Sequence, residues 1–200
     1  MLLFVILVIL LGFAIAFTIA FPYIYRYYYF HNYHKIFAKK IEHFCKKNNF
    51  ENLGILKIKS IHNELISIDH LVFGNKNIYL IEDFYCNCDV YGKQIDNSLL
   101  IRNDKNKQSF YVENPFHSAE QKISNLSQVL SIDKNLFIPV VIYNPSCNFI
   151  NLSKASNMCC YTRIKKIILN FESIDEEPLN RDQVVSTINE IKKISRKDVK

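Results

Sequence analysis

Apolar residues follow three successive patterns along the 200-residue chain. Residues 2–21 are almost continuously apolar, and no charged residue occurs before position 26. From 36 to 44, apolar residues recur at the three- to four-residue spacing of an amphipathic helix. From about 54 to 112, short β-branched stretches alternate with turns, a pattern typical of consecutive strands. The order predicts an apolar helix, an amphipathic helix and then a sheet.

The predicted elements form one domain after the apolar stretch. We expect an amphipathic helix at about 33–48 and further helices at about 115–131 and 181–195. The helix at 115–131 has Asn114 as its N-cap and Pro115 in its first turn. Strands are expected in a meander and then singly, at about 54–60, 65–73, 77–85, 89–95, 98–102, 109–112, 137–143 and 158–161. This order predicts an α/β or α+β fold, a mixed sheet flanked by helices.

The apolar N-terminus predicts one transmembrane helix. Residues 2–21 supply the roughly 20 apolar residues that cross a ~30 Å hydrocarbon core, and five tyrosines between 23 and 29 follow as an aromatic belt. A cleaved signal peptide is the alternative, since Ala14-Ile15-Ala16 resembles a cleavage site, but no positive segment precedes the run. We therefore expect an anchor at 1–25, a juxtamembrane segment at 26–33 and a domain at 34–196.

Positive charge is concentrated just after the predicted anchor. Residues 26–60 hold eight Lys or Arg against two Glu, a net charge of +6 that equals the formal excess of the whole chain. This placement predicts a domain on the cytoplasmic face of a membrane, attached by a single pass. The basic patch could contact membrane lipid headgroups or the phosphates of nucleic acid; its members are Lys35, Lys39, Lys40, Lys46 and Lys47.

Two carboxylates are predicted to lie side by side. Asp69 and Glu82 flank the turn at 74–77, and in a hairpin symmetric about that turn they are cross-strand neighbours, with Cβ atoms about 4.5–5.5 Å apart. Such a pair repels unless it shares a proton or a cation, and Mg²⁺ prefers oxygen ligands. The alternative is a strand-end Asp and a solvated Glu. Both interrupt apolar stretches, however, where an unpartnered charge is costly.

The chain from about 34 to 194 resembles the nuclease-related domain (NERD) family, part of the PD-(D/E)xK restriction-endonuclease-like superfamily. The resemblance rests on the order of four segments after the first amphipathic helix. They are Ile68-Asp69-His70-Leu71-Val72, Ile78-Tyr79-Leu80-Ile81-Glu82, Tyr91-Gly92-Lys93 and the helix start Asn114-Pro115, with Ile123 and Leu126 in register.

The resemblance implies that Asp69 and Glu82 are catalytic residues that hold Mg²⁺ for attack of water on a phosphodiester. The superfamily's lysine, two residues after the Glu, is replaced by Phe84, so a relocated Lys would be needed; Lys93, Lys107 and Lys122 are the candidates. Two further positions depart from the family pattern. His34-Lys35 replaces the usual Gly-Glu of the first helix, and the helix glutamine falls on Ser118, with Gln121 one turn later on the polar face.

These departures favour a degenerate, non-catalytic domain that acts as a membrane-anchored interaction or scaffold module. One alternative is a Mg²⁺-dependent nuclease acting on DNA at the cytoplasmic membrane face. Another is a nucleic-acid-binding module that does not cleave. No small-molecule cofactor is expected, because four glycines are too few for a phosphate-cradling loop. Protein partners cannot be named from the sequence.

The cysteines and histidines do not have the spacing of a metal site. Cys86-x-Cys88 and Cys159-Cys160 are not CxxC pairs, so we expect the six cysteines to be reduced structural thiols. The histidines are likewise expected to have structural or surface roles.

Overall fold

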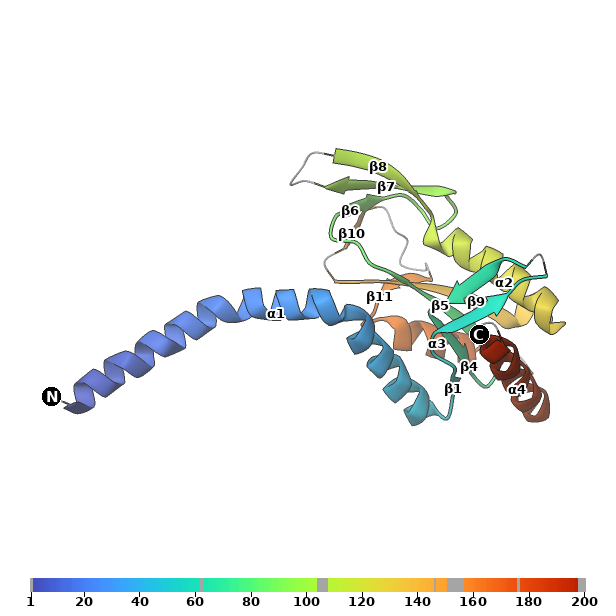
Figure 1. Cartoon of the computed structure of the whole chain (residues 1–200), viewed down its shortest axis with the longest axis horizontal. Coiled ribbons are helices and arrows are strands. Elements are labelled where there is room, and N and C mark those ends of the chain that lie inside the picture. Colours follow the sequence, from blue (N-terminus) through green and yellow to red (C-terminus); the bar gives the residue numbers. More distant parts are fainter. Residues whose placement is uncertain are drawn as a thin grey trace. The chain divides into compact units, whose positions relative to one another are not determined.

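The computed structural model describes residues 2–61, 63–103, 108–145, 147–150, 157–175 and 177–197 (Figure 1). For residues 2–9, 26, 29–31 and 196–197 it describes the backbone alone. The chain divides into two compact units, Met1–Lys39 and Lys40–Lys200.

The first unit belongs to one long helix, α1 (Leu2–Asn48). Residues 10–25 of α1 are exposed, although nearly all of them are apolar. Where side chains are described, no helix has an apolar stretch long enough to cross a membrane. Residues 1–9 of the expected anchor lie outside that set. The transmembrane segment therefore remains a prediction from sequence.

The amphipathic helix predicted at about 33–48 is the C-terminal part of α1. In the second unit, Ile41 and Phe44 are buried, whereas Lys46 and Lys47 are exposed. The rings of Phe44 and Phe50 meet edge to face, with centroids 5.8 Å apart. This contact fixes the end of the helix to the chain that enters the sheet.

The central element of the second unit is a five-stranded sheet, and it is mixed, as predicted. Its first two pairings are antiparallel and its last two are parallel. The strand order is β1 (Glu51–Asn52), β4 (His70–Phe73), β5 (Ile78–Phe84), β9 (Phe137–Tyr143) and β11 (Met158–Cys160).

The β4–β5 hairpin has the predicted symmetric register. Phe73 pairs with Ile78 and His70 pairs with Ile81, and the Gly74 N–H donates to the Asn77 carbonyl at 2.9 Å. One step beyond the last pair, the same register brings Asp69 opposite Glu82.

The predicted single strand at 65–73 was wrong, because the chain changes sheets at Asp69. Before that residue, β3 (Leu65–Ile68) pairs with β2 (Leu56–Lys59) in a two-stranded sheet. After it, β4 pairs with β1 and β5. The single meander was also wrong, since β6 (Asp89–Tyr91), β7 (Ser98–Asn103) and β8 (Gln108–Glu113) form a separate sheet with β10 (Asn148–Ile150).

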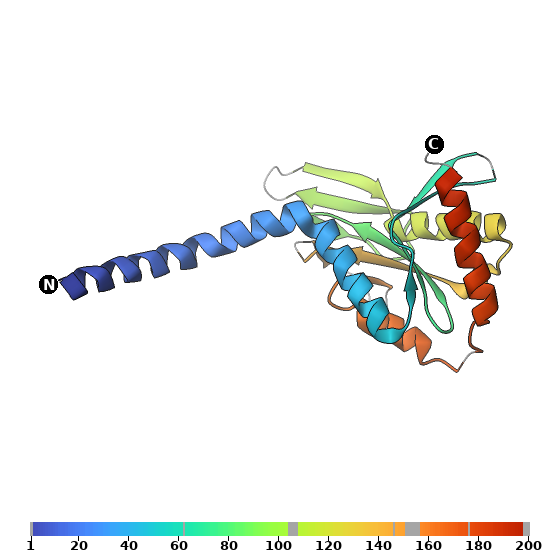
Figure 2. The ribbon, with the colours of Figure 1, turned by 60° about the horizontal axis from the view of Figure 1, so that its bottom comes forward.

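Helices cover both faces of the central sheet (Figure 1). On one face, Ile78 and Leu80 of β5 join a buried cluster with apolar residues of α2 (Pro115–Leu130) and α4 (Arg181–Lys197). Figure 2 shows these two helices together on that side. On the opposite face, the Tyr79 hydroxyl donates to Glu172 of α3 (Ile164–Glu172) at 2.7 Å.

The predicted face of α2 is confirmed. Four residues at helical spacing are buried: Ala119, Ile123, Leu126 and Leu130. Burying each of the larger side chains contributes about 1.5–3 kcal/mol, so this stripe fixes the rotation of the helix. Sequence reasoning missed α3, β10 and the short 3₁₀ turn Lys134–Leu136.

Candidate functional site

The two predicted carboxylates lie beside each other at one end of the β4–β5 hairpin. Glu82 is on the same face of β5 as Ile78 and Leu80, because alternate side chains of a strand share a face. Asp69 precedes β4, and its side chain is held by β5, because its Oδ2 accepts a hydrogen bond from the Asp83 N–H at 2.9 Å. The break between β3 and β4 therefore brings Asp69 to the edge of the face covered by α2.

A lysine of α2 supplies the cation that the strand motif lacks. The Lys122 Nζ lies 2.6 Å from Oε2 of Glu82. Lys122 lies at the margin of the buried stripe of α2, one residue before Ile123. This buried face of α2 packs on β5. The side chains of Lys122 and Glu82 expose only 24% and 11% of their surface, so little water screens the pair.

Burial dominates the electrostatics of Glu82. It raises the pKa of this carboxyl to about 7, although the hydrogen bond and charge of Lys122 act in the opposite direction. The charges of Asp69 and Asp83 raise the pKa further. Oε1 of Glu82 is buried and has no hydrogen-bond partner among the described residues. The site therefore combines three neighbouring carboxyl groups with one acceptor oxygen that has no donor in the described part of the chain.

The residue at the usual lysine position packs elsewhere. Phe84 borders a hydrophobic cluster built around Val90 and Val141, and its ring centroid lies 6.2 Å from that of Phe149. Its side chain belongs to the packing between the central sheet and the β6–β10 sheet. The ammonium beside Glu82 instead comes from the helix.

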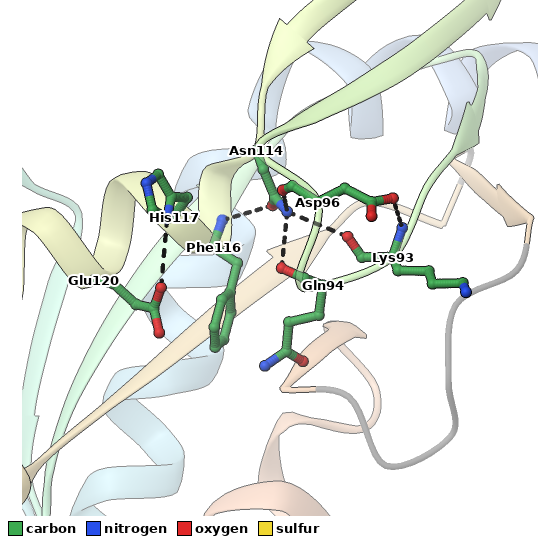
Figure 3. Close-up of polar contacts among 7 residues, drawn as sticks. All are labelled: Lys93, Gln94, Asp96, Asn114, Phe116, His117 and Glu120. Carbon is green, nitrogen blue, oxygen red and sulfur yellow. Dashed lines mark hydrogen bonds and ion pairs between the residues drawn. The ribbon is translucent and has the colours of Figure 1, made fainter.

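Lys93 does not take that place in the structure. Its N–H donates to the Asp96 carboxylate at 2.7 Å, in a turn whose carbonyl oxygens accept hydrogen bonds from the Asn114 side chain. Asn114 also caps α2 by accepting from the Phe116 N–H, as predicted for this helix start. Figure 3 shows the Lys93 side chain pointing away from α2. Lys107, the third candidate, lies outside the described residues.

Among the described residues, no hydrogen bond joins the side chains of Ser118 and Gln121, the other predicted site residues of α2, to the carboxylate pair. The Ser118 N–H donates to the Asn114 carbonyl, and Gln121 is exposed. His117 instead forms a pair with Glu120, Nδ1 to Oε2 at 3.6 Å (Figure 3). The roles predicted for Ser118 and Gln121 at the site stay predictions.

The basic patch is partly engaged in local contacts. In the second unit, Lys40 lies over the Tyr161 ring, 3.9 Å from its centroid, and Lys46 pairs with Glu42 at 2.8 Å. Lys47 is exposed, as are Lys35 and Lys39 of the first unit. All five members are exposed, and Lys35, Lys39 and Lys47, which form no ion pair or ring contact among the described residues, are best placed to meet an external anion.

The donor set at the carboxylate pair suits a hard cation with few protein ligands. No group of three or more His, Cys, Asp or Glu side chains able to hold a metal occurs among the described residues. Mg²⁺ in phosphoryl-transfer sites is often bound by one or two carboxylates, with water and substrate phosphate completing the octahedron. The free acceptor atom of Glu82 beside Asp69 fits that mode.

Comparison with known proteins identifies the family. A model of the nuclease-related domain (NERD) matches residues 29–144, more than half of the chain. The chain belongs to the NERD family. The matched region includes Asp69, Glu82 and Lys122, whereas α3 and α4 of this NERD protein follow it. No curated protein and no solved structure matches the chain.

Sequence reasoning missed two features of this site, the Asp83 amide that fixes Asp69 and the Asp83 charge that acts on Glu82. It named Lys122 without a reason to prefer it. A usable signal was present: Lys122 borders the apolar stripe of a helix that was predicted to cover the sheet, whereas Lys93 lies beside a glycine in a turn.

Proposed function

We propose that this NERD domain is a Mg²⁺-dependent nuclease that uses a lysine from α2 in place of the strand lysine. The observation that carries the proposal is the ion pair between Lys122 and Glu82, with Nζ 2.6 Å from Oε2. The sequence favoured a scaffold because Phe84 replaces the motif lysine. An ammonium supplied by the helix removes the main ground for that preference.

Asp69 and Glu82 would hold the metal. Oε1 of Glu82 is buried and has no donor among the described residues. Asp69 uses Oδ2 for the Asp83 amide, which leaves its Oδ1 for a ligand. Bound Mg²⁺ would supply Lewis-acid activation of a water and of the scissile phosphate. The pKa of about 7 for Glu82 means that a cation competes with a proton for this carboxylate near neutral pH.

Lys122 would hold the nucleophile and offset the charge that develops on the phosphate. Its charge lies in a largely buried position, where a fixed donor stabilises a developing anion more strongly than in water. The apolar stripe of α2 packs on the sheet, so the ammonium is positioned by the fold before substrate arrives. Glu82 orients it by accepting its hydrogen bond.

The experiment is DNA cleavage by the full chain in detergent, with linear and supercoiled substrates and Mg²⁺. Lys122→Met should lower the cleavage rate about 10²–10³-fold, the usual effect of removing one charge-stabilising donor. Lys122→Arg keeps a cation beside Glu82 and separates loss of charge from loss of fold. Lys93→Met is the matched control on an exposed lysine and should cleave like the wild type.

Metal binding in the same samples distinguishes the remaining outcomes. Asp69→Asn and Glu82→Gln should weaken Mn²⁺ and Mg²⁺ binding measured by calorimetry, whereas Lys122→Met should retain it. If folded wild-type protein cleaves neither linear nor supercoiled DNA, the nuclease proposal is refuted. Salt-dependent DNA binding without cleavage would then leave a binding module, and absence of both would leave the scaffold.

We further propose that residues 2–21 anchor the nuclease in a membrane, with the domain on the cytoplasmic side. Support comes from the uncharged apolar run and from the exposure of apolar side chains all around α1 between 10 and 25; a helix that is apolar on every side needs an apolar surrounding. The wild type should stay in alkali-washed membranes, and Leu11→Arg with Phe13→Arg should release it. Ile61→Arg, at an exposed position of the domain, is the control, and release of the wild type would refute the anchor.

A further inference from the structure

Three thiols gather where two parallel strands end. Cys86 and Cys88 follow β5, and Cys147 follows β9. Because β5 and β9 are parallel neighbours, the segments that leave them emerge at the same edge of the sheet. Cys86 and Cys147 are both buried in the hydrophobic cluster around Val90, and Cys88 packs against that cluster.

Backbone hydrogen bonds tie the two segments together. The Asn144 side-chain Oδ1 accepts from the Cys86 N–H at 2.9 Å, and the Asn144 carbonyl accepts from the Cys147 N–H at 3.0 Å. The Asn148 N–H donates to the Cys88 carbonyl at 3.3 Å. β6 and β10 then continue as a parallel pair. Asn144, itself buried, thereby fixes both cysteines relative to each other.

The three thiols change one another's acidity. Hydrogen bonding from Cys147, and more weakly from Cys88, lowers the pKa of Cys86 to about 7, while the same contact and burial raise the pKa of Cys147. The thiolate is the reactive form of cysteine. Near neutral pH one thiol of the pair is therefore activated while the other remains protonated beside it.

Two other buried cysteines provide the contrast. Burial raises the pKa of Cys45 and of Cys159 to about 12. Both are thereby kept as unreactive thiols. The described residues contain no group of three or more His, Cys, Asp or Glu side chains able to hold a metal.

We propose that Cys86 and Cys147 are an oxidant-reactive dithiol that forms a reversible disulfide with hydrogen peroxide as the oxidant. The Cys86 thiolate attacks one peroxide oxygen and breaks the O–O bond, giving a sulfenic acid and, after protonation of the departing hydroxide, one water. The Cys147 thiol then attacks the Cys86 sulfur, forming the S–S bond and releasing a second water. Overall, two thiols lose two hydrogen atoms and the peroxide becomes two waters.

The disulfide would join the segments that follow β5 and β9 covalently. Cys86 lies four residues after Glu82, just beyond the end of β5. The modification needs neither a metal nor DNA, so it stands or falls independently of the proposed nuclease activity.

The test is oxidation of the full chain in detergent with a small molar excess of hydrogen peroxide at pH 7, followed by alkylation of the remaining thiols under denaturing conditions and peptide mass spectrometry. The expected product is one cross-linked peptide pair that contains Cys86 and Cys147 and is two hydrogen atoms lighter than the reduced peptides. Dithiothreitol should restore both thiols. Cys45 and Cys159 should be recovered as alkylated residues.

Variants make the assignment specific. Cys86→Ser should remove the cross-link and the rapid loss of thiol titre, whereas Cys159→Ser, the matched buried control, should leave both unchanged. Before oxidation, alkylation of native protein should modify Cys86 roughly tenfold faster than Cys45. A product that joins Cys86 to Cys88, equal oxidation of all six thiols, or a cross-link that survives Cys86→Ser would overturn the proposal.

Discussion

Glu82 and Cys86 lie four residues apart, and each exposes less than a tenth of its surface, yet the protein changes their acidity in opposite directions. At Glu82, loss of hydration outweighs an ammonium 2.6 Å away, so the pKa rises. At Cys86, hydrogen bonding from neighbouring thiols outweighs burial, so the pKa falls. The direction of each shift follows from which groups face the side chain rather than from exposed surface alone.

The largest expected change in unfolding free energy comes from removing the Lys122 cation beside Glu82. Lys122→Met leaves a carboxylate buried without its partner, and breaking a buried pair costs about 3–5 kcal/mol. Urea unfolding at pH 8 should show that loss, and the double variant with Glu82→Gln should recover much of it. Equal stability of wild type and Lys122→Met would mean that the pair does not form in solution.

The pH dependence of stability should come next in size. Glu82 has a pKa of about 7 in the folded domain against an ordinary value of 4.5, so its contribution is complete below pH 4.5 and is lost as the pH rises towards 7. Over that range, metal-free protein should lose about 3 kcal/mol of unfolding free energy through this group. In Glu82→Gln the slope should be smaller, as followed by urea unfolding with chelator present.

A third change moves the comparison to the thiols. Asn144→Ala removes the acceptor for the buried Cys86 N–H, and an unsatisfied buried amide costs about 1–3 kcal/mol. The variant should also form the Cys86–Cys147 cross-link more slowly, because the side-chain hydrogen bond that links the two segments at Cys86 is lost, while the Asn148 N–H bond to the Cys88 carbonyl remains. Asn170→Ala on the exposed surface of α3 is the control, and unchanged cross-linking in Asn144→Ala would remove Asn144 from this role.

The smallest effect is expected at the third thiol. Cys88 is only partly buried, so Cys88→Ser should change unfolding free energy by less than about 0.5 kcal/mol, as is usual for surface changes. It should also leave the Cys86–Cys147 disulfide as the oxidation product. Loss of the disulfide in this variant would show that Cys88 is the partner in place of Cys147.

The sequence was sufficient for the parts of the fold that depend on local periodicity. The face of α2, the strand at 137–143 and the register of the β4–β5 hairpin follow from spacing within one segment. The break at Asp69 could not be predicted in this way. The apolar pattern runs on from Ile66 to Phe73, and only the partner strands reveal that two sheets share that stretch.

The candidate site was likewise predictable only where it depends on residues within one local segment. The juxtaposition of Asp69 and Glu82 follows from one hairpin, whereas the choice of Lys122 depends on how α2 lies on β5, which brings together two residues 40 positions apart in the sequence. The dithiol depends on the edge shared by β5 and β9. Spacing rules for metal sites led us to expect reduced structural thiols, and the structure shows all six cysteines free; those rules consider proximity in sequence alone and do not reveal that Cys86 and Cys147 lie in one cluster.

Because the chain changes sheets at Asp69, the carboxylate pair forms only when the β2–β3 sheet and the central sheet are both folded. Asp69 is covalently continuous with β3, which pairs only with β2, and with β4, which belongs to the central sheet. Local opening of the two-stranded ribbon, which costs less than global unfolding, would free Asp69 while Glu82 stays in place. If the proposed metal site forms, the domain should lose metal affinity at a lower temperature than the one at which its core melts.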